Sequence, residues 1–158
     1  MTHILQGDYL AYVFGEHGDT SFIPWSGAYV SGVSLDEYYE TVEKMGRNVT
    51  KIDKDAMLEY VRTSGGQVIA NKGATFYAVS VAVCKLVATI LSSSDSVATV
   101  SSMMHGEYGI EDVCLSTLTL VGPKGVQGKI PMRMTKEEVE KLKASADALK
   151  AVIAQIEH

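Results

Sequence analysis

Apolar positions along the chain follow two different spacings, which predict both helices and strands. Steps of three and four residues, or apolar character on every side, predict helices at 35–45, 53–72, 74–91 and 135–156. Runs of branched and aromatic residues predict strands at 9–14, 97–103, 112–121 and 126–134, the last two joined as a hairpin through 122–125. Because the strands flank a central pair of helices, the expected class is α+β with antiparallel strands and long helices.

Residues that favour helix ends stand at the borders of these stretches. Asp53 is placed to cap the first turn of its helix, and Thr135 with Glu138 forms a capping box. Gly73 separates the two central helices. Gly65–Gly66 interrupts the first of them at a cost of roughly 1 kcal/mol per glycine relative to alanine, so we expect a packing or distortion reason there.

Length and composition predict one compact domain over residues 1–158. The chain is 46% apolar and 21% charged, with a formal net charge of -5 and no basic run, so neither nucleic acid nor anionic lipid is an expected partner. The N-terminus shows no secretory signal pattern, which makes the cytoplasm the expected compartment. The apolar stretch 76–91 is shorter than the roughly 20 residues of a membrane span and contains Lys85, so it is predicted to be a buried core helix.

Cysteines and histidines give no sign of a metal site or a disulfide framework. Cys84 lies in an apolar run and Cys114 in a strand-like run, which predicts reduced side chains in the core. The four histidines lack the spacing typical of metal ligands, so no metal is expected.

The candidate chemistry is concentrated in Gly15-Glu16-His17-Gly18-Asp19. Glycines let the backbone approach a ligand closely, and an imidazole titrates near neutral pH. Taken alone, the pattern fits an exposed turn as well as a catalytic loop. A hydrolase built on Glu16, His17 and Asp19 is a further alternative, but it lacks a nucleophile or a metal set.

A family resemblance extends this motif along nearly the whole chain. The motif continues through Thr20-Ser21 to Pro24-Trp25-Ser26, and Lys72-Gly73-Ala74-Thr75 and Gly106-Glu107-Tyr108-Gly109 follow in order. In sequence and spacing these segments resemble the C-terminal, substrate-binding half of L-lactate dehydrogenases in the lactate/malate dehydrogenase family. The resemblance implies the fold of that C-terminal domain.

The same resemblance implies a reaction and roles for three residues. The family interconverts (S)-lactate and pyruvate with NAD or NADH, and His17 matches the histidine that donates or accepts the proton on the C2 oxygen. Thr75 matches a substrate-binding threonine, and Val79 an aliphatic residue near the nicotinamide ring. In the family, the aspartate that orients the histidine and the arginine that binds the substrate carboxylate come from the other half. No G-x-G-x-x-G occurs here, so we expect the Rossmann domain to be absent and the isolated chain to be inactive.

Two other functions are also compatible with the sequence, and two positions differ from the family pattern. The chain could belong to a malate or branched 2-hydroxy acid dehydrogenase. It could also be a non-catalytic oligomerisation module that forms a homo-oligomer or associates with a full-length dehydrogenase through an exposed apolar patch. Leu10 stands where allosteric relatives carry a histidine for a sugar bisphosphate, so such activation is not expected. Gly66 replaces a common aromatic residue.

Overall fold

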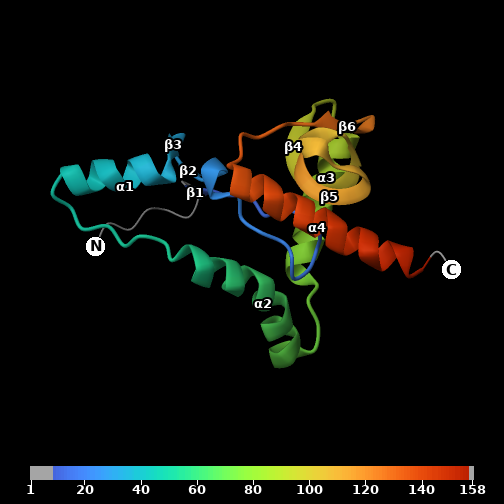
Figure 1. Ribbon diagram of the computed structural model, residues 1–158, viewed down its shortest axis with the longest axis horizontal. Coiled ribbons are helices and arrows are strands. Elements are labelled where there is room, and N and C mark those ends of the chain that lie inside the picture. The colour runs from blue at the N-terminus through green and yellow to red at the C-terminus, as the bar shows by residue number, and fades with distance from the viewer. Residues whose placement is uncertain (1–8, 157–158) are drawn as a thin grey trace.

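The computed structural model describes residues 9–156 and confirms the α+β class with antiparallel sheets. Within these residues the chain forms two three-stranded sheets, four α-helices and two short 3₁₀ helices (Figure 1). In chain order the elements are β1 (Tyr9–Leu10), η2 (Trp25–Gly27), β2 (Tyr29–Val30), β3 (Val33–Ser34), α1 (Leu35–Lys44), α2 (Lys54–Lys72), α3 (Tyr77–Leu91), β4 (Ser96–His105), η3 (Glu107–Gly109), β5 (Glu111–Gly122), β6 (Gly125–Lys129) and α4 (Lys136–Ala154).

The larger sheet, in the order β4-β5-β6, carries the main core. β4 pairs with β5 from Ser96 opposite Val121 to Met103 opposite Cys114, and β5 and β6 form the predicted hairpin. β6 ends at Lys129 and does not reach Met134 as predicted. The sheet packs against α4 and the segment before η2, and the side chains buried between them are Phe14, Phe22, Met104, Ile110, Val113, Leu115, Leu118, Leu142 and Ala146.

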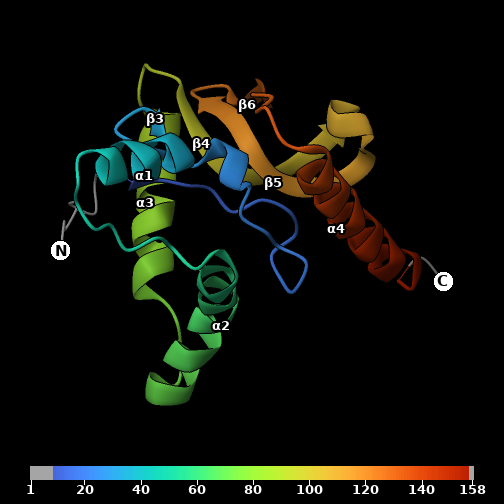
Figure 2. The same ribbon diagram turned by 60° about the vertical axis from the view of Figure 1, so that its left-hand side comes forward.

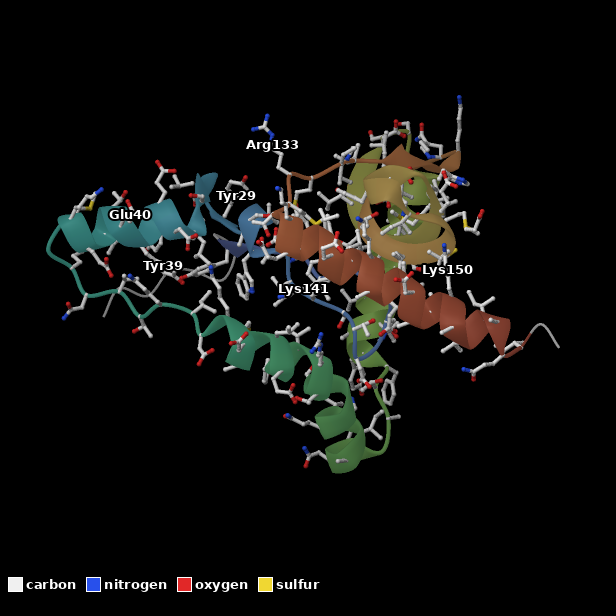
Figure 3. The ribbon with its side chains drawn as sticks, viewed as in Figure 1. Tyr29, Tyr39, Glu40, Arg133, Lys141 and Lys150 are labelled. Carbon is white, nitrogen blue, oxygen red and sulfur yellow. The ribbon has the colours of Figure 1, made fainter. Side chains whose placement is uncertain are left out.

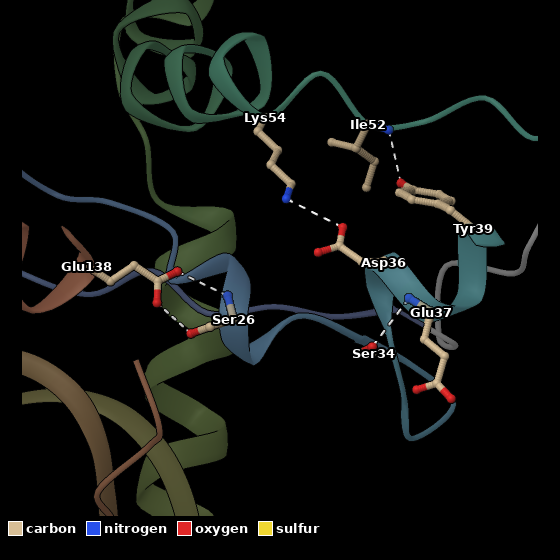
Figure 4. A network of polar contacts seen from close by, with 8 residues as sticks. All are labelled: Ser26, Ser34, Asp36, Glu37, Tyr39, Ile52, Lys54 and Glu138. Atoms are coloured by element: carbon tan, nitrogen blue, oxygen red, sulfur yellow. Dashed lines mark hydrogen bonds and ion pairs between the residues drawn. The ribbon is translucent and has the colours of Figure 1, made fainter. Parts of the chain in front are cut away.

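The start of α4 is fixed by the predicted capping box. The Thr135 hydroxyl accepts the Glu138 backbone N–H at 3.2 Å, and the Glu138 carboxylate accepts the Thr135 N–H at 2.8 Å. The same carboxylate accepts the backbone N–H of Ser26 at 3.0 Å and its hydroxyl at 2.5 Å (Figure 4). The cap therefore also ties α4 to η2.

The smaller sheet, in the order β1-β2-β3, packs against α1. Ala28, Val30, Leu35 and Tyr39 form its buried cluster. The predicted strand at 9–14 is only partly correct, because just Tyr9–Leu10 joins this sheet. The chain then leaves it, and Phe14 and Gly15 pair with Phe22 and Ser116. The segment thus passes from one sheet to the other instead of remaining in a single strand.

Polar contacts connect the smaller sheet and α1 to the beginning of α2. The Ile52 backbone N–H donates to the Tyr39 hydroxyl at 3.0 Å, and Lys54 lies 3.6 Å from the Asp36 carboxylate (Figure 4). The Lys54 ammonium also lies 5.7 Å from the centre of the Trp25 ring. Asp53 caps α2 as predicted, with its carboxylate accepting two backbone N–H groups.

The apolar stretch 76–91, which corresponds to α3, was expected to be a buried core helix. In the structure, α2 and the beginning of α3 project from the sheets (Figures 1 and 2), and no described residue of either helix is buried. α3 contacts β5, but side chains such as Val79 and Val81 remain more than half exposed. The prediction of a buried core helix is therefore wrong for this chain, because nothing among residues 9–156 covers the other sides of α3.

None of the helices among residues 9–156 is both long and apolar enough to cross a membrane.

The two cysteines are free thiols, but neither lies in the core as predicted. Cys84 is exposed on α3, and Cys114 is exposed on β5 between the buried residues Val113 and Leu115. Successive residues of a strand face opposite sides, so an apolar run in a sheet covered on one face necessarily exposes half of its members.

Gly65 and Gly66 do not fulfil the expectation of a packing reason. α2 continues through both glycines, and a Cβ added at either would meet nothing within 4 Å.

We expect Gly66→Ala to raise the free energy of unfolding by about 0.5–1 kcal/mol, because alanine has the higher helix propensity. Urea unfolding would test this, with Gly73→Ala as the control. Gly73 ends the helix at a φ of 83°, so alanine there should lower stability instead. A Gly66→Ala protein less stable than the parent would contradict the prediction.

Glu107 contributes stability that depends on pH. The His105 backbone N–H donates to its carboxylate at 2.6 Å, and this bond lowers the pKa of Glu107 below its ordinary value. A lowered folded-state pKa gives stability that is present above about pH 4.3 and is lost as the pH falls through the folded-state pKa. We therefore expect Glu107→Gln to be less stable than the parent at neutral pH and the difference to shrink in acid. Parallel urea titrations would detect it, and a constant difference would contradict this account.

Candidate active site

His17 lies at the tip of a tight hairpin formed by residues 14–22. The backbone groups of Phe14 and Phe22 exchange hydrogen bonds of 2.8 and 3.0 Å at its base. Gly15 and Ser116 exchange a further pair of 3.1 and 2.9 Å, which joins the hairpin to β5. The chain reverses between these anchors, so the His17 side chain is exposed on a backbone that is held at its base.

Gly15 is required where the hairpin meets α4. Its φ is 101°, in the left-handed region that favours glycine, and a Cβ there would lie 2.7 Å from the Ser145 hydroxyl. Gly15, the first residue of the histidine motif, therefore lets the hairpin approach α4 closely.

Ser145, which is fully buried on α4, holds the hairpin through its hydroxyl. This oxygen accepts the Glu16 backbone N–H at 2.8 Å and lies 2.9 Å from the Thr20 hydroxyl. The Glu16 carboxylate in turn accepts the backbone N–H and the hydroxyl of Thr20 at 2.9 and 2.8 Å. Glu16 is thus hydrogen-bonded within the hairpin.

A hollow of about 410 Å³ opens beside His17. Its walls come from the hairpin, α2, β4 and β5. The residues in its lining whose side chains can donate or accept hydrogen bonds are Glu16, His17, Asp19, Ser21, Arg62, Thr99 and Ser116. Arg62 reaches it from α2, and its Nε donates to the Ser21 carbonyl oxygen at 3.0 Å.

The sequence did not single out Ser145 or Arg62. Ser145 had one signal, because it is a polar residue within the apolar face that contains Leu142 and Ala146. Arg62 had none, because an arginine on an exposed helix is usually a solvated side chain. Both residues reach the hairpin from distant positions in the chain, so only the folded structure brings them to His17.

Thr75 and Val79 do not line the hollow beside His17. Thr75 is exposed in the connection between α2 and α3, and Val79 is 54% exposed on α3. Figure 2 shows the start of α3 well separated from the hairpin that contains His17. The structure therefore brings together His17 and Arg62, but not the three residues implied by the resemblance. Among residues 9–156, no three His, Cys, Asp or Glu side chains gather as a metal site would require.

Leu10 lines a second hollow, of about 480 Å³, that is almost entirely apolar. Its other walls include Trp25, Ile52, Met57 and Val61, so it lies between the smaller sheet and the first half of α2. Apart from tyrosine hydroxyls, its lining offers no titratable group.

Comparison with known proteins identifies the family. The model of the lactate/malate dehydrogenase alpha/beta C-terminal domain matches residues 6–158. The chain belongs to the lactate/malate dehydrogenase family. It is 37% identical over 147 residues to the L-lactate dehydrogenase of Acetivibrio thermocellus, covering 93% of this chain and 45% of that enzyme. It is 40% identical over 145 residues to that of Thermoanaerobacterium saccharolyticum, covering 92% and 46%.

Solved structures of the lactate/malate dehydrogenase family agree with this assignment. The L-lactate dehydrogenase of Clostridium thermocellum superposes with a TM-score of 0.81 at 34% identity, covering 96% of this chain and 48% of that one. The malate dehydrogenase of Archaeoglobus fulgidus, solved in complex with NADH, gives 0.78 at 27% identity, covering 94% and 44%. This family member therefore spans a little under half the length of its relatives.

Proposed function

We propose that this chain is the substrate-binding, proton-transferring half of an NAD-dependent L-lactate dehydrogenase that interconverts (S)-lactate and pyruvate. The observation that carries the proposal is the position of His17. It is an exposed imidazole on a firmly anchored hairpin, beside a hollow larger than a three-carbon acid. L-lactate dehydrogenase relatives at 37% and 40% identity support the choice of substrate.

His17 acts as the general acid and base of this proposal. In pyruvate reduction its imidazolium gives a proton to the C2 oxygen as that carbon becomes an alcohol carbon, and in lactate oxidation the neutral imidazole takes the proton back. The hairpin that carries the ring is anchored on both sides of His17, because Ser116 holds the Gly15 backbone and Ser145 contacts the Glu16 backbone N–H and the Thr20 hydroxyl. General acid–base catalysis of this kind contributes about 10²–10⁴-fold to a rate.

The cofactor, when bound, would accept the hydride from lactate as NAD or donate it to pyruvate as NADH. Of the described residues, Val79 offers an exposed apolar surface of the kind that fits a nicotinamide ring, and the Thr75 hydroxyl is exposed to contact substrate. Neither residue provides a phosphate-binding loop, so the rest of the cofactor site is assigned to the part that the longer relatives have in addition. Seating of α2 and α3 against that part would bring Thr75 and Val79 to the substrate.

The test is complementation with the N-terminal half of the Acetivibrio thermocellus enzyme, expressed separately. We expect the 158-residue chain alone to show negligible NADH oxidation with pyruvate, and the mixture to show clear turnover. Oxaloacetate and a branched 2-oxo acid, offered in parallel, would reveal a malate or branched 2-hydroxy acid dehydrogenase. A mixture that associates and binds NADH but turns over none of the three would contradict the proposal.

One observation favours a second candidate, a non-catalytic oligomerisation module. Apolar side chains of α3 are exposed, among them Val81, Val83 and Val87, and such patches mark interaction surfaces. This module would form a homo-oligomer or associate with a full-length dehydrogenase. Sedimentation equilibrium over a range of concentrations would show the association. The oligomerisation module is the preferred function only if complementation yields a complex without activity.

A further inference from the structure

Arg62 forms a polar clamp between α2 and the hairpin that carries His17. Its Nε donates to the Ser21 carbonyl oxygen at 3.0 Å, and its Nη2 donates to the same oxygen. Two N–H groups of one planar guanidinium therefore converge on one backbone carbonyl of the hairpin. Ser21 is itself buried and donates its backbone N–H to the Gly18 carbonyl at 3.2 Å, so the clamped residue lies next to the turn.

The clamp differs from the other anchors of the hairpin in where it comes from. Ser116 and Ser145 belong to β5 and α4, which bury the main core. α2 has no buried residue in the described chain, and its other polar contacts with the body are made at its first residue, Lys54. Arg62 is therefore the point at which a loosely packed helix holds the catalytic hairpin.

Arg62 also divides two hollows. On one side is the hollow with His17, and on the other is one of about 260 Å³ lined by Thr20, Phe22, Leu58, Lys141 and Ala144. Arg62 is the residue that both linings share, so it borders both hollows. Its loss would remove both the hydrogen bonds to Ser21 and the wall that supports this side of the hairpin.

We propose that Arg62 is a positioning residue for His17. Through it, the position of α2 relative to the hairpin and the orientation of the imidazole are coupled. The clamp orders the hairpin from the α2 side, and movement of α2 changes the orientation of His17 through the Ser21 carbonyl. The catalytic consequence rests on the proposed function of His17, whereas the mechanical coupling does not.

The first test of the coupling compares Arg62→Met and Arg62→Lys in the 158-residue chain by NMR. In Arg62→Met we expect the backbone amides of Ser21 and Phe22 to exchange at least about tenfold faster, because the clamp is a hydrogen bond from a charged donor. The imidazole signals of His17 should move towards those of an unconstrained histidine, and Arg62→Lys should restore them in part. Unchanged β5 amide signals would show that the core is intact.

A matched control is Arg133→Met, which removes an exposed arginine whose side chain points away from the molecule (Figure 3). Lys54→Met is a second control, because it weakens the start of α2 without touching the hairpin. Neither should change the His17 signals. The proposal is overturned if Arg62→Met behaves like Arg133→Met, or if Lys54→Met has the same effect on His17 as Arg62→Met.

A second measurement separates this inference from the proposed function. In the complemented enzyme, Arg62→Met should lower kcat for pyruvate at least about tenfold with little change in KM, since proton transfer and not binding depends on the imidazole orientation. If His17→Gln has no effect on activity, the proposed function fails, while the exchange and NMR data still decide whether Arg62 positions the hairpin.

Discussion

Replacing His17 by glutamine is expected to lower pyruvate reduction by the complemented enzyme by about 10²–10⁴-fold. Glutamine is similar in size to histidine and can hydrogen-bond the C2 oxygen, but it cannot transfer a proton at neutral pH. Because the side chain is exposed at the hairpin tip, the change should leave the free energy of unfolding within about 0.5 kcal/mol of the parent. Steady-state NADH oxidation and urea unfolding on the same preparations provide both readouts.

His105→Gln is the matched control for this experiment. His105 is also exposed, but it lies at the end of β4 and does not line the hollow that contains His17. It should retain full activity with the complementing half. Equal activity of His17→Gln and the parent would remove His17 from the reaction, and an equal loss in both variants would indicate a general effect of histidine substitution.

The helix ends could be predicted from the sequence because they depend on local chemistry. Asp53 and Thr135 with Glu138 cap α2 and α4 as expected, and Gly73 ends α2 in the left-handed region. The hairpin of β5 and β6 was also predictable, because its turn residues lie next to one another in the chain. These features depend on contacts between residues that are close together in the sequence, so they can be inferred without knowing the tertiary structure.

The surroundings of each element were less predictable, because they depend on distant parts of the chain. The apolar composition of α3 indicated burial, yet none of its described residues is buried. Composition shows that a helix is apolar, but it does not show which other element packs against it. Cys114 was misplaced because an apolar run does not reveal which face of a strand is covered. For the same reason the motif pointed to His17 as a candidate but not to Ser145 or Arg62, which contact the hairpin from α4 and α2.

Gly15→Ala is expected to lower the free energy of unfolding by about 2–4 kcal/mol, the largest stability effect that we predict. Two costs add at this position. An alanine at a φ of 101° adopts a conformation that L residues rarely occupy, and its Cβ would lie 2.7 Å from the buried Ser145 hydroxyl. The hairpin must then move away from α4, which would break the hydrogen bond from the Glu16 backbone N–H to Ser145 and displace His17.

Gly32→Ala separates the two costs. Gly32 has a similar φ of 87°, but a Cβ there would meet nothing within 4 Å, so alanine should cost only about 1–2 kcal/mol through backbone strain. In a double-mutant cycle, Ser145→Ala should recover about 1 kcal/mol of the loss caused by Gly15→Ala, because it removes the oxygen that the new Cβ would meet. Urea unfolding of the four proteins in the cycle measures this coupling. Equal losses for Gly15→Ala and Gly32→Ala, with no coupling to Ser145, would mean that the close approach of the hairpin to α4 does not constrain the position of His17.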